Sequence, residues 1–398
     1  MLIGIVGRTN TGKSSLFKAA TLAEVEIANR PFVTIKPSHG IGFVKVNCPD
    51  KDFDVKCNPK SGYCLDGNRF VPIDLLDVAG LIRGAHKGAG LGLQFLDDLR
   101  QADALIEVID ASGSTNDKGE PAQPGNYNPR EDIIVLEEEI DMWFYGLIKK
   151  GWDRLAKQIQ QEKLEVVKAL AKQFSGLKIT EEMVEDTIKE LDLYKNITSW
   201  TEEDLKGLAI TLRKRSKPMI IAANKIDLPG AKENLETLKK EFKDYSIIPC
   251  SAEAEIALRE AARKGLIRYV PGEDNFQILK EEKLNEQQKK ALEFIKKSVL
   301  DVYGSTGVQD VLNMAVFELL KYIPVYPVTN NRLEDKDGRR LPDCFIVPEG
   351  TTASEFAFKI HSDIGNNFVK AIDLRTKQAI GKDHKLRNSD VIEIMTSK

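Results

Sequence analysis

The sequence lacks any apolar run long enough to cross a bilayer, so we expect no membrane-spanning segment and no membrane partner. It also lacks an excess of charge of one sign. Its 58 Lys and Arg against 61 Asp and Glu leave a net charge of −3, so no overall field favours binding to DNA or RNA. The five cysteines do not have the regular spacing of a disulfide framework. This cysteine pattern leads us to expect a cytoplasmic protein, and the first residues predict a strand rather than a signal peptide.

Apolar runs separated by helical patterns indicate an α/β fold. A length of 398 residues predicts two or three domains, and 42% apolar residues are enough for well-filled cores. Such an alternation is typical of a parallel sheet with helices on both faces. The pattern predicts a helix from near Lys13 to about Leu22 and a proline-containing loop over 24–40. The predicted strands lie at 2–6, 71–76, 104–109, 218–223 and 245–249.

The uneven spacing of these strands predicts further units. About a hundred residues separate the third strand from the fourth, where a compact α/β unit needs far fewer. Residues 112–130 indicate an exposed loop, and helical periodicity follows to about 215, which predicts an inserted helical subdomain. After Tyr322, strands near 343–347, 368–373 and 390–395 and a helix near 352–361 predict a small α+β domain. The expected units are 1–270 with an insertion at about 113–216, a helical extension at 271–322, and 323–398.

A phosphate-binding loop follows the first strand. Residues 7–14 read G-x-x-x-x-G-K-S, in which the glycines allow the close approach of main-chain N–H groups to phosphates. The N-terminus of the next helix favours the same negative charge. Lys13 can reach the outer phosphates, and the Ser14 hydroxyl can bind Mg²⁺. The residues expected to contact the nucleotide here are Gly7, Arg8, Thr9, Asn10, Thr11, Gly12, Lys13, Ser14 and Ser15.

A D-x-x-G sequence and a threonine complete the expected metal site. Asp77 follows the strand at 71–76, the usual place for a second magnesium-associated carboxylate, and the N–H of Gly80 could meet a γ-phosphate. The hydroxyl of Thr34 could bind Mg²⁺ only while that phosphate is present, which would order its loop. The expected metal ligands are Ser14, Thr34 and Asp77, and the residues expected to serve hydrolysis are Lys13, Thr34, Asp77, Gly80 and Asn10.

An N-K-x-D sequence after the strand at 218–223 suits a guanine ring. The Asp227 carboxylate can accept hydrogen bonds from both the N1–H and the 2-amino group of guanine, whereas adenine has no N1–H. Asn224 can contact the other purine edge and connect the loops, and the stem of Lys225 can cover the ring. A backbone N–H at Ala252 could donate to guanine O6. The expected base-binding residues are Asn224, Lys225, Asp227, Ser251, Ala252 and Glu253.

The position that holds a water-orienting Gln in many GTPases is Leu81 here. An aliphatic side chain cannot hold the attacking water by hydrogen bonds, so either hydrolysis is slow or another group positions the water. The amide oxygen of Asn10 could hold a monovalent cation near the phosphates, in which case K⁺ would raise turnover. The alternative interpretation is that Asn10 only tightens the loop.

Three segments resemble a known family. Residues 77–92 (DVAGLIRGAHKGAGLG) are similar to the long second-switch signature of Obg-related GTPases, and residues 29–35 (NRPFVTI) resemble their first switch. The D-x-A-G start and the layout resemble the YchF branch, and residues 386–394 (LRNSDVIEI) resemble a TGS domain. The resemblance implies a G domain interrupted by helices, GTP hydrolysis with a hydrophobic residue at the Gln position, and association with ribosomes or other RNA assemblies. Some YchF members lack a regular N-K-x-D and favour ATP, whereas this chain keeps it.

Two features allow several interpretations. Cys48, Cys57 and Cys64 lie in a segment between Val46 and Phe70 that the family pattern does not require. Zinc sites usually have closer cysteine pairs, so a metal site, a Cys57–Cys64 disulfide and plain thiols are all open. Basic residues on the inserted helices could meet RNA phosphates or form a solvated face. They are Lys149, Lys150, Arg154, Lys157, Lys163, Lys168 and Lys172, with a second group at Arg213, Lys214, Arg215 and Lys217.

These observations favour a Mg²⁺-dependent GTPase that acts as a slow switch between its GTP and GDP forms, with ribosomes or RNA as the expected partner. A second hypothesis is a nucleotide-gated RNA or ribosome adaptor with negligible hydrolysis, which Leu81 keeps open. A third is an ATPase.

Overall fold

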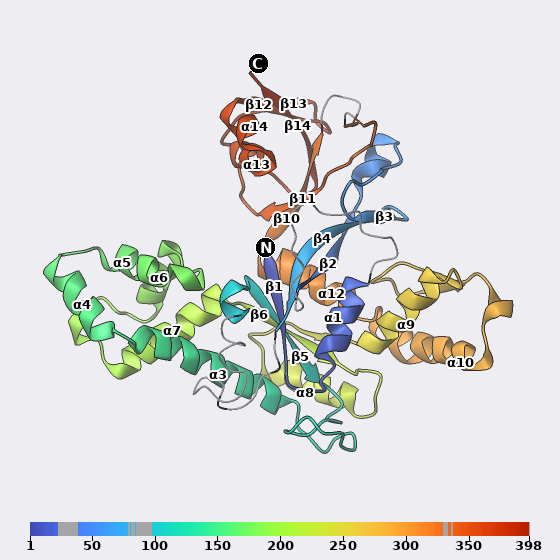
Figure 1. Cartoon of the computed structure of the whole chain (residues 1–398), viewed down its shortest axis with the longest axis horizontal. Coiled ribbons are helices and arrows are strands. Elements are labelled where there is room, and N and C mark those ends of the chain that lie inside the picture. The colour runs from blue at the N-terminus through green and yellow to red at the C-terminus, as the bar shows by residue number, and fades with distance from the viewer. Residues whose placement is uncertain are drawn as a thin grey trace.

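The computed structural model describes most of the chain as a central sheet domain with three projecting parts (Figure 1). A helical arm extends to one side, a second helical region to the other, and a C-terminal domain lies above the sheet. Thr34 and Leu81 lie outside the described residues. The described residues are 1–22, 39–78, 80, 84, 98–328, 333–335 and 337–397.

The central sheet has the strand order β2-β4-β1-β5-β6-β7, and β3 pairs with the first three residues of β4, from Asn68 to Phe70. Strands β4, β1, β5, β6 and β7 are parallel to one another, whereas β2 and β3 pair antiparallel with β4. The mainly parallel α/β sheet predicted from the sequence is therefore confirmed. The strands are β1 (Leu2–Val6), β2 (His39–Asn47), β3 (Tyr63–Leu65), β4 (Asn68–Asp77), β5 (Ala104–Asp110), β6 (Met219–Asn224) and β7 (Ile247–Pro249).

The antiparallel edge strand β2 corrects the predicted loop over 24–40, because His39 and Gly40 already belong to the sheet. Glycine weakens strand propensity, which hid this strand in the sequence. A Cβ on Gly40 would lie 2.6 Å from the Phe17 ring, and one on Gly42 would lie 2.5 Å from the Leu75 side chain. The glycines therefore allow β2 to pack closely against its neighbours.

Alternating side chains of the strands form two cores, one on each face of the sheet. On β1, Ile3 and Ile5 pack in one core with α1 (Lys13–Thr21), α9 (Ala252–Arg263) and α12 (Val308–Asn313). Val6 packs in the other core with helices of the inserted arm. A third cluster places α8 (Ala231–Glu241) beside β6. Because the sheet is covered on both faces, β5 and β6 are buried along their whole length.

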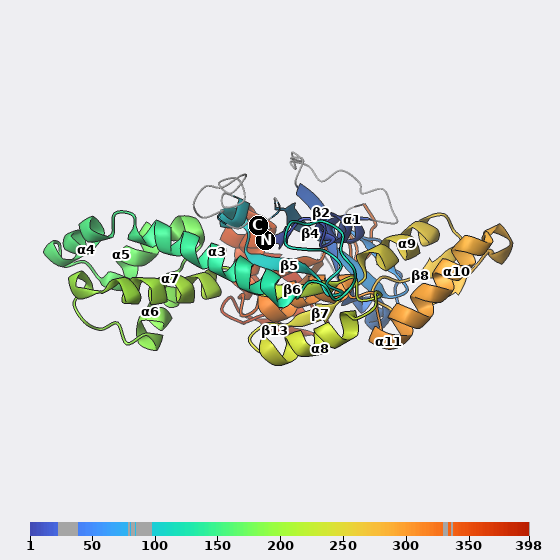
Figure 2. The ribbon, with the colours of Figure 1, turned by 90° about the horizontal axis from the view of Figure 1, so that it is seen from below.

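The helical insertion is built on two long helices, α3 (Arg130–Lys149) and α7 (Glu202–Ser216), which lie side by side in both ribbon views (Figures 1 and 2). Buried Arg213 of α7 donates from Nε to Asp141 of α3 at 2.6 Å, which fixes the base of the arm. The arm is completed by α4 (Trp152–Gln161), α5 (Val166–Gln173) and α6 (Glu181–Glu190).

Residues after α9 form the second helical region, where the sequence predicts a helical extension over 271–322. A short hairpin, β8 (Ile267–Tyr269) and β9 (Phe276–Ile278), precedes α10 (Glu286–Ile295), the π-helical turn η6 (Lys296–Leu300) and α11 (Asp301–Tyr303). After α12, the π-helical turn η7 (Met314–Leu319) packs against the central sheet. The proposed boundaries of the units remain predictions.

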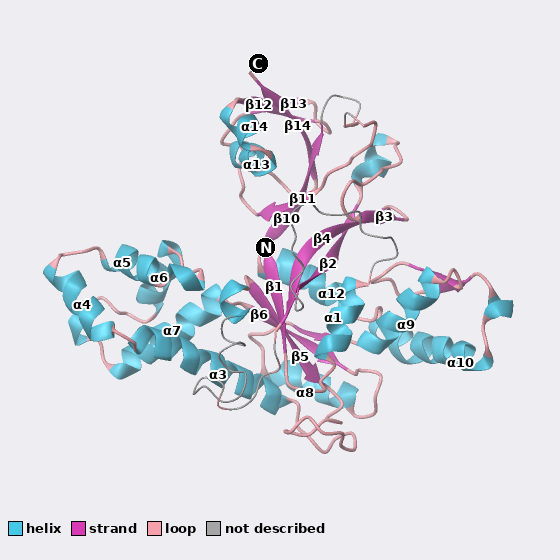
Figure 3. Ribbon diagram, in the orientation of Figure 1, coloured by secondary structure: helices cyan, strands magenta, loops and turns pink. Residues whose placement is uncertain are grey.

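The C-terminal domain is the small α+β unit that the sequence predicts (Figure 3). Its strand order is β11-β10-β14-β12-β13, and α13 packs on this sheet through buried Phe356. Its elements are β10 (Tyr322–Val328), β11 (Phe345–Pro348), α13 (Ala353–Ile360), α14 (Ser362–Asn366), β12 (Phe368–Asp373), β13 (Gln378–Ile380) and β14 (Asp390–Thr396). Over the described part of the chain, none of the helices has the length and apolar character of a membrane span.

Candidate nucleotide-binding site

The phosphate-binding loop connects the carboxyl end of β1 to the first turn of α1, as the sequence predicts. Gly7 has φ +153° and Gly12 has φ +96°, conformations that favour glycine. A Cβ on Gly7 would lie 2.5 Å from the Val108 carbonyl oxygen, and one on Gly12 would overlap the side-chain amide of Asn224. Both glycines are therefore required by the fold as well as by any phosphate that the loop holds.

Lys13 and Asp77 meet beside this loop. Asp77 ends β4, the strand that neighbours β1, and the Lys13 ammonium donates to its Oδ1. Gly80 also lies against the loop, because a Cβ at that position would be 3.4 Å from the Thr9 hydroxyl oxygen. Three of the residues assigned to the phosphates and the metal are thus brought together, whereas Thr34 lies outside the described residues.

Asn224 connects the phosphate-binding loop to the loop after β7. Its side-chain nitrogen donates to the Thr11 carbonyl at 2.9 Å, and its side-chain oxygen accepts from the Ala252 N–H at 3.1 Å. The Ala252 N–H, which we expected to meet guanine O6, is therefore bound to Asn224 in this structure. A further contact, from the Ser15 hydroxyl to Glu253 at 2.7 Å, joins α1 to α9.

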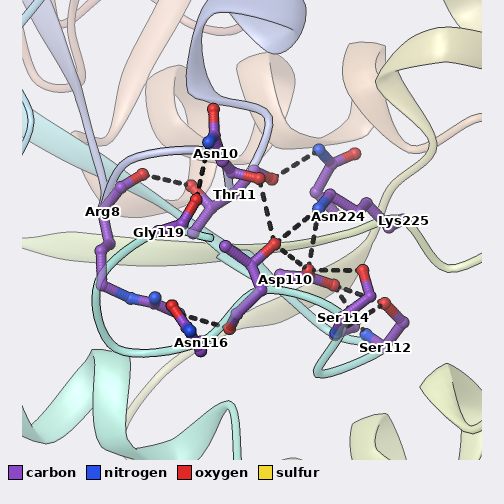
Figure 4. Close-up of polar contacts among 12 residues, drawn as sticks. Arg8, Asn10, Thr11, Asp110, Ser112, Ser114, Asn116, Gly119, Asn224 and Lys225 are labelled. Carbon is purple, nitrogen blue, oxygen red and sulfur yellow. Dashed lines mark hydrogen bonds and ion pairs between the residues drawn. The ribbon is translucent and has the colours of Figure 1, made fainter. Parts of the chain in front are cut away.

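Lys225 is held by a group that the sequence analysis did not identify (Figure 4). Its ammonium donates to Asp110 Oδ2 at 2.8 Å and to the Thr115 hydroxyl at 2.9 Å. Asp110 also accepts hydrogen bonds from the hydroxyls of Ser112 and Ser114. Burial opposes ionisation of this carboxyl, but the bonds from Lys225, Ser112 and Thr115 outweigh it and lower the pKa of Asp110. The anchored ammonium fixes the path of the Lys225 stem.

Asp227 lies in the loop after β6, at the same edge of the sheet as the phosphate-binding loop. Its side chain is half-buried and has no hydrogen bond or ion pair to the other described residues. The Leu228 N–H donates to the Lys225 carbonyl at 3.0 Å, which closes the turn that carries Asp227. A carboxylate with unused acceptor capacity at this edge can accept two adjacent N–H groups of a ligand.

The loop after β5 covers one side of the phosphate-binding loop. The Asn10 side-chain nitrogen donates to the Gly119 carbonyl at 2.6 Å, and Asn10 itself has φ +64°. Arg8 lies over the Tyr127 ring, 4.3 Å from its centroid, and its Nε donates to Asp132 of α3 at 2.7 Å. The bond to Gly119 is compatible with the loop-tightening interpretation of Asn10, and it turns the amide nitrogen, not the amide oxygen, toward the loop after β5.

Helix α3 therefore touches two parts of the site. Besides the pair between Arg8 and Asp132, buried Glu139 accepts the Gly84 N–H at 2.7 Å, and Gly84 belongs to the long switch signature. Neither contact could be read from the sequence, because the partners are 124 and 55 residues apart.

Comparisons with known proteins agree with this architecture. A model described as 50S ribosome-binding GTPase matches residues 2–139, and a TGS domain model matches 335–396. A model described as Obg-like GTPase YGR210-like, G4 motif-containing domain matches 222–330, which includes the Asn224–Asp227 sequence. An uncharacterized GTP-binding protein of Methanocaldococcus jannaschii is 50% identical over 100% of this chain and 99% of its own. The chain belongs to the YchF branch of the Obg-related GTPases.

Other YchF-like relatives cover less of the chain or are less similar to it. An uncharacterized GTP-binding protein of Schizosaccharomyces pombe is 36% identical over 89% of this chain and 88% of its own. The ribosome-binding ATPase YchF of Bacillus subtilis is 30% identical over 66% and 68%. Among solved structures, a GTP-binding protein of Pyrococcus horikoshii matches with a TM-score of 0.80 and 38% identity over 100% of both chains. The YchF GTPase of S. pombe, at 0.57 and 21%, shares the fold.

Proposed function

We propose that this YchF-like protein is a Mg²⁺-dependent GTPase with a low intrinsic rate that switches between GTP and GDP forms. The observation that carries the proposal is the bridge made by Asn224, which holds the Thr11 carbonyl and the Ala252 N–H at once. It places the phosphate-binding loop and the loop of Asp227 at one edge of the sheet, where parallel α/β sheets bind ligands. One nucleotide can then contact both loops.

The residues beside the phosphate-binding loop fit a nucleotide with its metal. Lys13 and Asp77 pair with each other, and both side chains are partly exposed. In the nucleotide complex Lys13 would neutralise phosphate charge, while Ser14, Thr34 and Asp77 would hold Mg²⁺. The metal supplies further charge neutralisation at the phosphates. Gly80 offers an N–H to the γ-phosphate. No general base is present in this assignment, which agrees with slow hydrolysis.

Guanine specificity rests on Asp227. Relatives named ATPases, the YchF of B. subtilis and Obg-like ATPase 1 of Rattus norvegicus, make ATP the competing substrate. We expect Asp227→Ala to lower GTP affinity by about 10²-fold or more and to remove the preference for GTP over ATP. The reason is that the guanine N1–H then loses the carboxylate that accepts its hydrogen bond. Competition of GTP, GDP and ATP against a fluorescent GDP measures this. The control is Asp244→Ala, which removes an exposed carboxylate outside the proposed site. An unchanged GTP to ATP ratio in Asp227→Ala refutes the assignment.

A ribosome or another RNA assembly in the cytoplasm is the partner that we propose. Its support is the printed description of the matching family model and the ribosome-binding names of YchF relatives. Single-turnover GTP hydrolysis with and without ribosomes tests the proposal. A rate raised by ribosomes supports a GTPase switch. Ribosome binding that depends on nucleotide, with no hydrolysis in either condition, supports the alternative of a gated adaptor.

Potassium ions are a proposed activator. The Asn10 amide nitrogen is held by Gly119, so its oxygen is the atom left to face a cation beside the phosphates. GTP hydrolysis is expected to be faster in K⁺ than in Na⁺ at equal ionic strength, and Asn10→Ala is expected to remove the difference. Equal rates in the two salts for the unaltered protein would leave Asn10 with the loop-tightening role alone.

A further inference from the structure

The segment between β2 and β4 gathers three cysteines and an aspartate at one point. Cys48 follows β2, Asp50 lies in the 3₁₀ helix η1 (Pro49–Phe53), Cys57 lies in the following loop, and Cys64 lies in β3. The three Sγ atoms and one carboxylate oxygen all lie within 4.8 Å of one another. All five cysteines are free thiols, so no Cys57–Cys64 disulfide accounts for this grouping.

The spacing of the four donor atoms suits a single metal ion. Zinc in structural sites takes four ligands in a tetrahedron, with Zn–S distances of about 2.3 Å and carboxylate oxygens as accepted donors. A tetrahedron of that size has edges of about 3.8 Å. The atoms therefore need to move by only about 1 Å to close around the ion. Three thiolates favour zinc over the hard cations Mg²⁺ and Ca²⁺.

Burial and an unsatisfied oxygen also point to a ligand. Cys48 is buried, Cys57 and Cys64 are half-buried, and Asp50 Oδ1 is buried with no hydrogen-bond partner among the described residues. A buried carboxylate oxygen without a partner is costly unless it binds something. Arg69 of β4, fully buried, stands opposite Cys64 in the strand pairing, so a positive charge lies beside the cluster.

We propose that Cys48, Asp50, Cys57 and Cys64 form a structural zinc site. The site is distinct from the nucleotide-binding edge of the sheet and does not depend on the proposed GTPase activity. It closes the connection between β2 and β4 into a compact unit, because a segment of this size cannot build a hydrophobic core of its own.

The contacts around the cluster indicate what the zinc stabilises. Arg69 donates to the carbonyls of Leu341 and Pro342 at 3.0 and 2.9 Å, and the Asn58 N–H donates to the Arg340 carbonyl at 2.9 Å. Residues 340–342 belong to the C-terminal domain, between β10 and β11. A zinc ion at the cluster therefore fixes the surface on which this domain rests against the sheet domain.

Metal content of the full chain tests the site. The protein is purified with a reductant, incubated with Zn²⁺ and desalted, and zinc is then measured by mass spectrometry. About one ion per chain is expected. Cys57→Ser is expected to lose it, whereas Cys344→Ser, a thiol outside the cluster, retains it. Asp50→Asn, a conservative replacement, is expected to weaken zinc binding by more than about tenfold, since even groups behind the ligands contribute that much.

Two further measurements on the unaltered protein test the zinc site even if Cys57→Ser folds poorly. Co²⁺ in the unaltered protein is expected to give thiolate charge-transfer bands and the intense visible bands of tetrahedral coordination. Removal of zinc by a chelator is expected to lower the melting temperature of the unaltered protein, while its GDP affinity stays unchanged. No zinc retained under reducing conditions, zinc retained by Cys57→Ser, or only three titratable thiols in the denatured, unreduced protein would each overturn the proposal. The last result would establish a disulfide.

Discussion

Replacing Asn224 separates the architecture of the site from its base specificity. The side chain is 3% exposed and makes two hydrogen bonds to main-chain groups of two loops, with Thr11 and Ala252. Asn224→Ala leaves both of these buried groups unpaired. An unsatisfied buried polar group costs about 1–3 kcal/mol, so the free energy of unfolding should fall by about 2–6 kcal/mol.

The same substitution should weaken nucleotide binding without changing its specificity. In the variant, the nucleotide must order the two loops that Asn224 otherwise holds together. Each 1.4 kcal/mol of free energy that this ordering costs lowers the affinity tenfold. We expect GDP and GTP affinity to fall by at least about tenfold, with the GTP to ATP preference kept because Asp227 is intact. Urea unfolding of the nucleotide-free protein and titration calorimetry measure the two effects.

Asn234→Ala is the matched control, because its side chain makes one hydrogen bond, to the Ala111 carbonyl at 2.8 Å. It should cost about 1 kcal/mol and leave nucleotide affinity unchanged. If Asn224→Ala has the stability and GDP affinity of the unaltered protein, the bridge between the loops does not organise the site, and the reasoning from it fails.

Two other predictions follow from buried groups. Burial lowers the pKa of Lys217 from 10.5 to about 8, so between these pH values the unfolded chain binds more protons than the folded chain. The free energy of unfolding should therefore rise with pH in this range by about 3 kcal/mol. Lys217→Met should abolish the rise, as measured by urea unfolding from about pH 7.5 to 10.5. Glu139→Ala removes the acceptor for the Gly84 N–H, so the difference in hydrogen exchange of α3 between GTP-bound and GDP-bound protein should shrink, whereas exposed Glu138→Ala should leave it intact. An α3 difference of full size in Glu139→Ala would show that this helix does not sense the switch through Gly84.

The sequence predicts the parts of the fold that depend on local pattern. The buried parallel strands are continuous apolar runs, and the phosphate-binding loop is set by glycines whose spacing is visible in the chain. Strand β2 escaped prediction because Gly40 and Gly42 lower its propensity while serving close packing against Phe17 and Leu75. The β8–β9 hairpin escaped because its strands are three residues each.

The sequence likewise predicts only part of the candidate site. The residues of the motifs are brought to one edge, but the partners that hold them are distant in sequence. Asp110 binds Lys225 across 115 positions, and nothing in the local pattern marks it except its place at the end of a strand. The cysteine spacing left three interpretations open, and only the fold shows that Cys48, Cys57 and Cys64 converge with Asp50.

A crystal structure of the full chain with Mg²⁺ and a non-hydrolysable GTP analogue tests the central claim most directly. We expect the phosphates to lie against the main-chain N–H groups of residues 7–14 and the guanine N1 and 2-amino nitrogens to lie within hydrogen-bond distance of the Asp227 carboxylate. A base bound away from Asp227, with the phosphates still in the loop, would contradict the account.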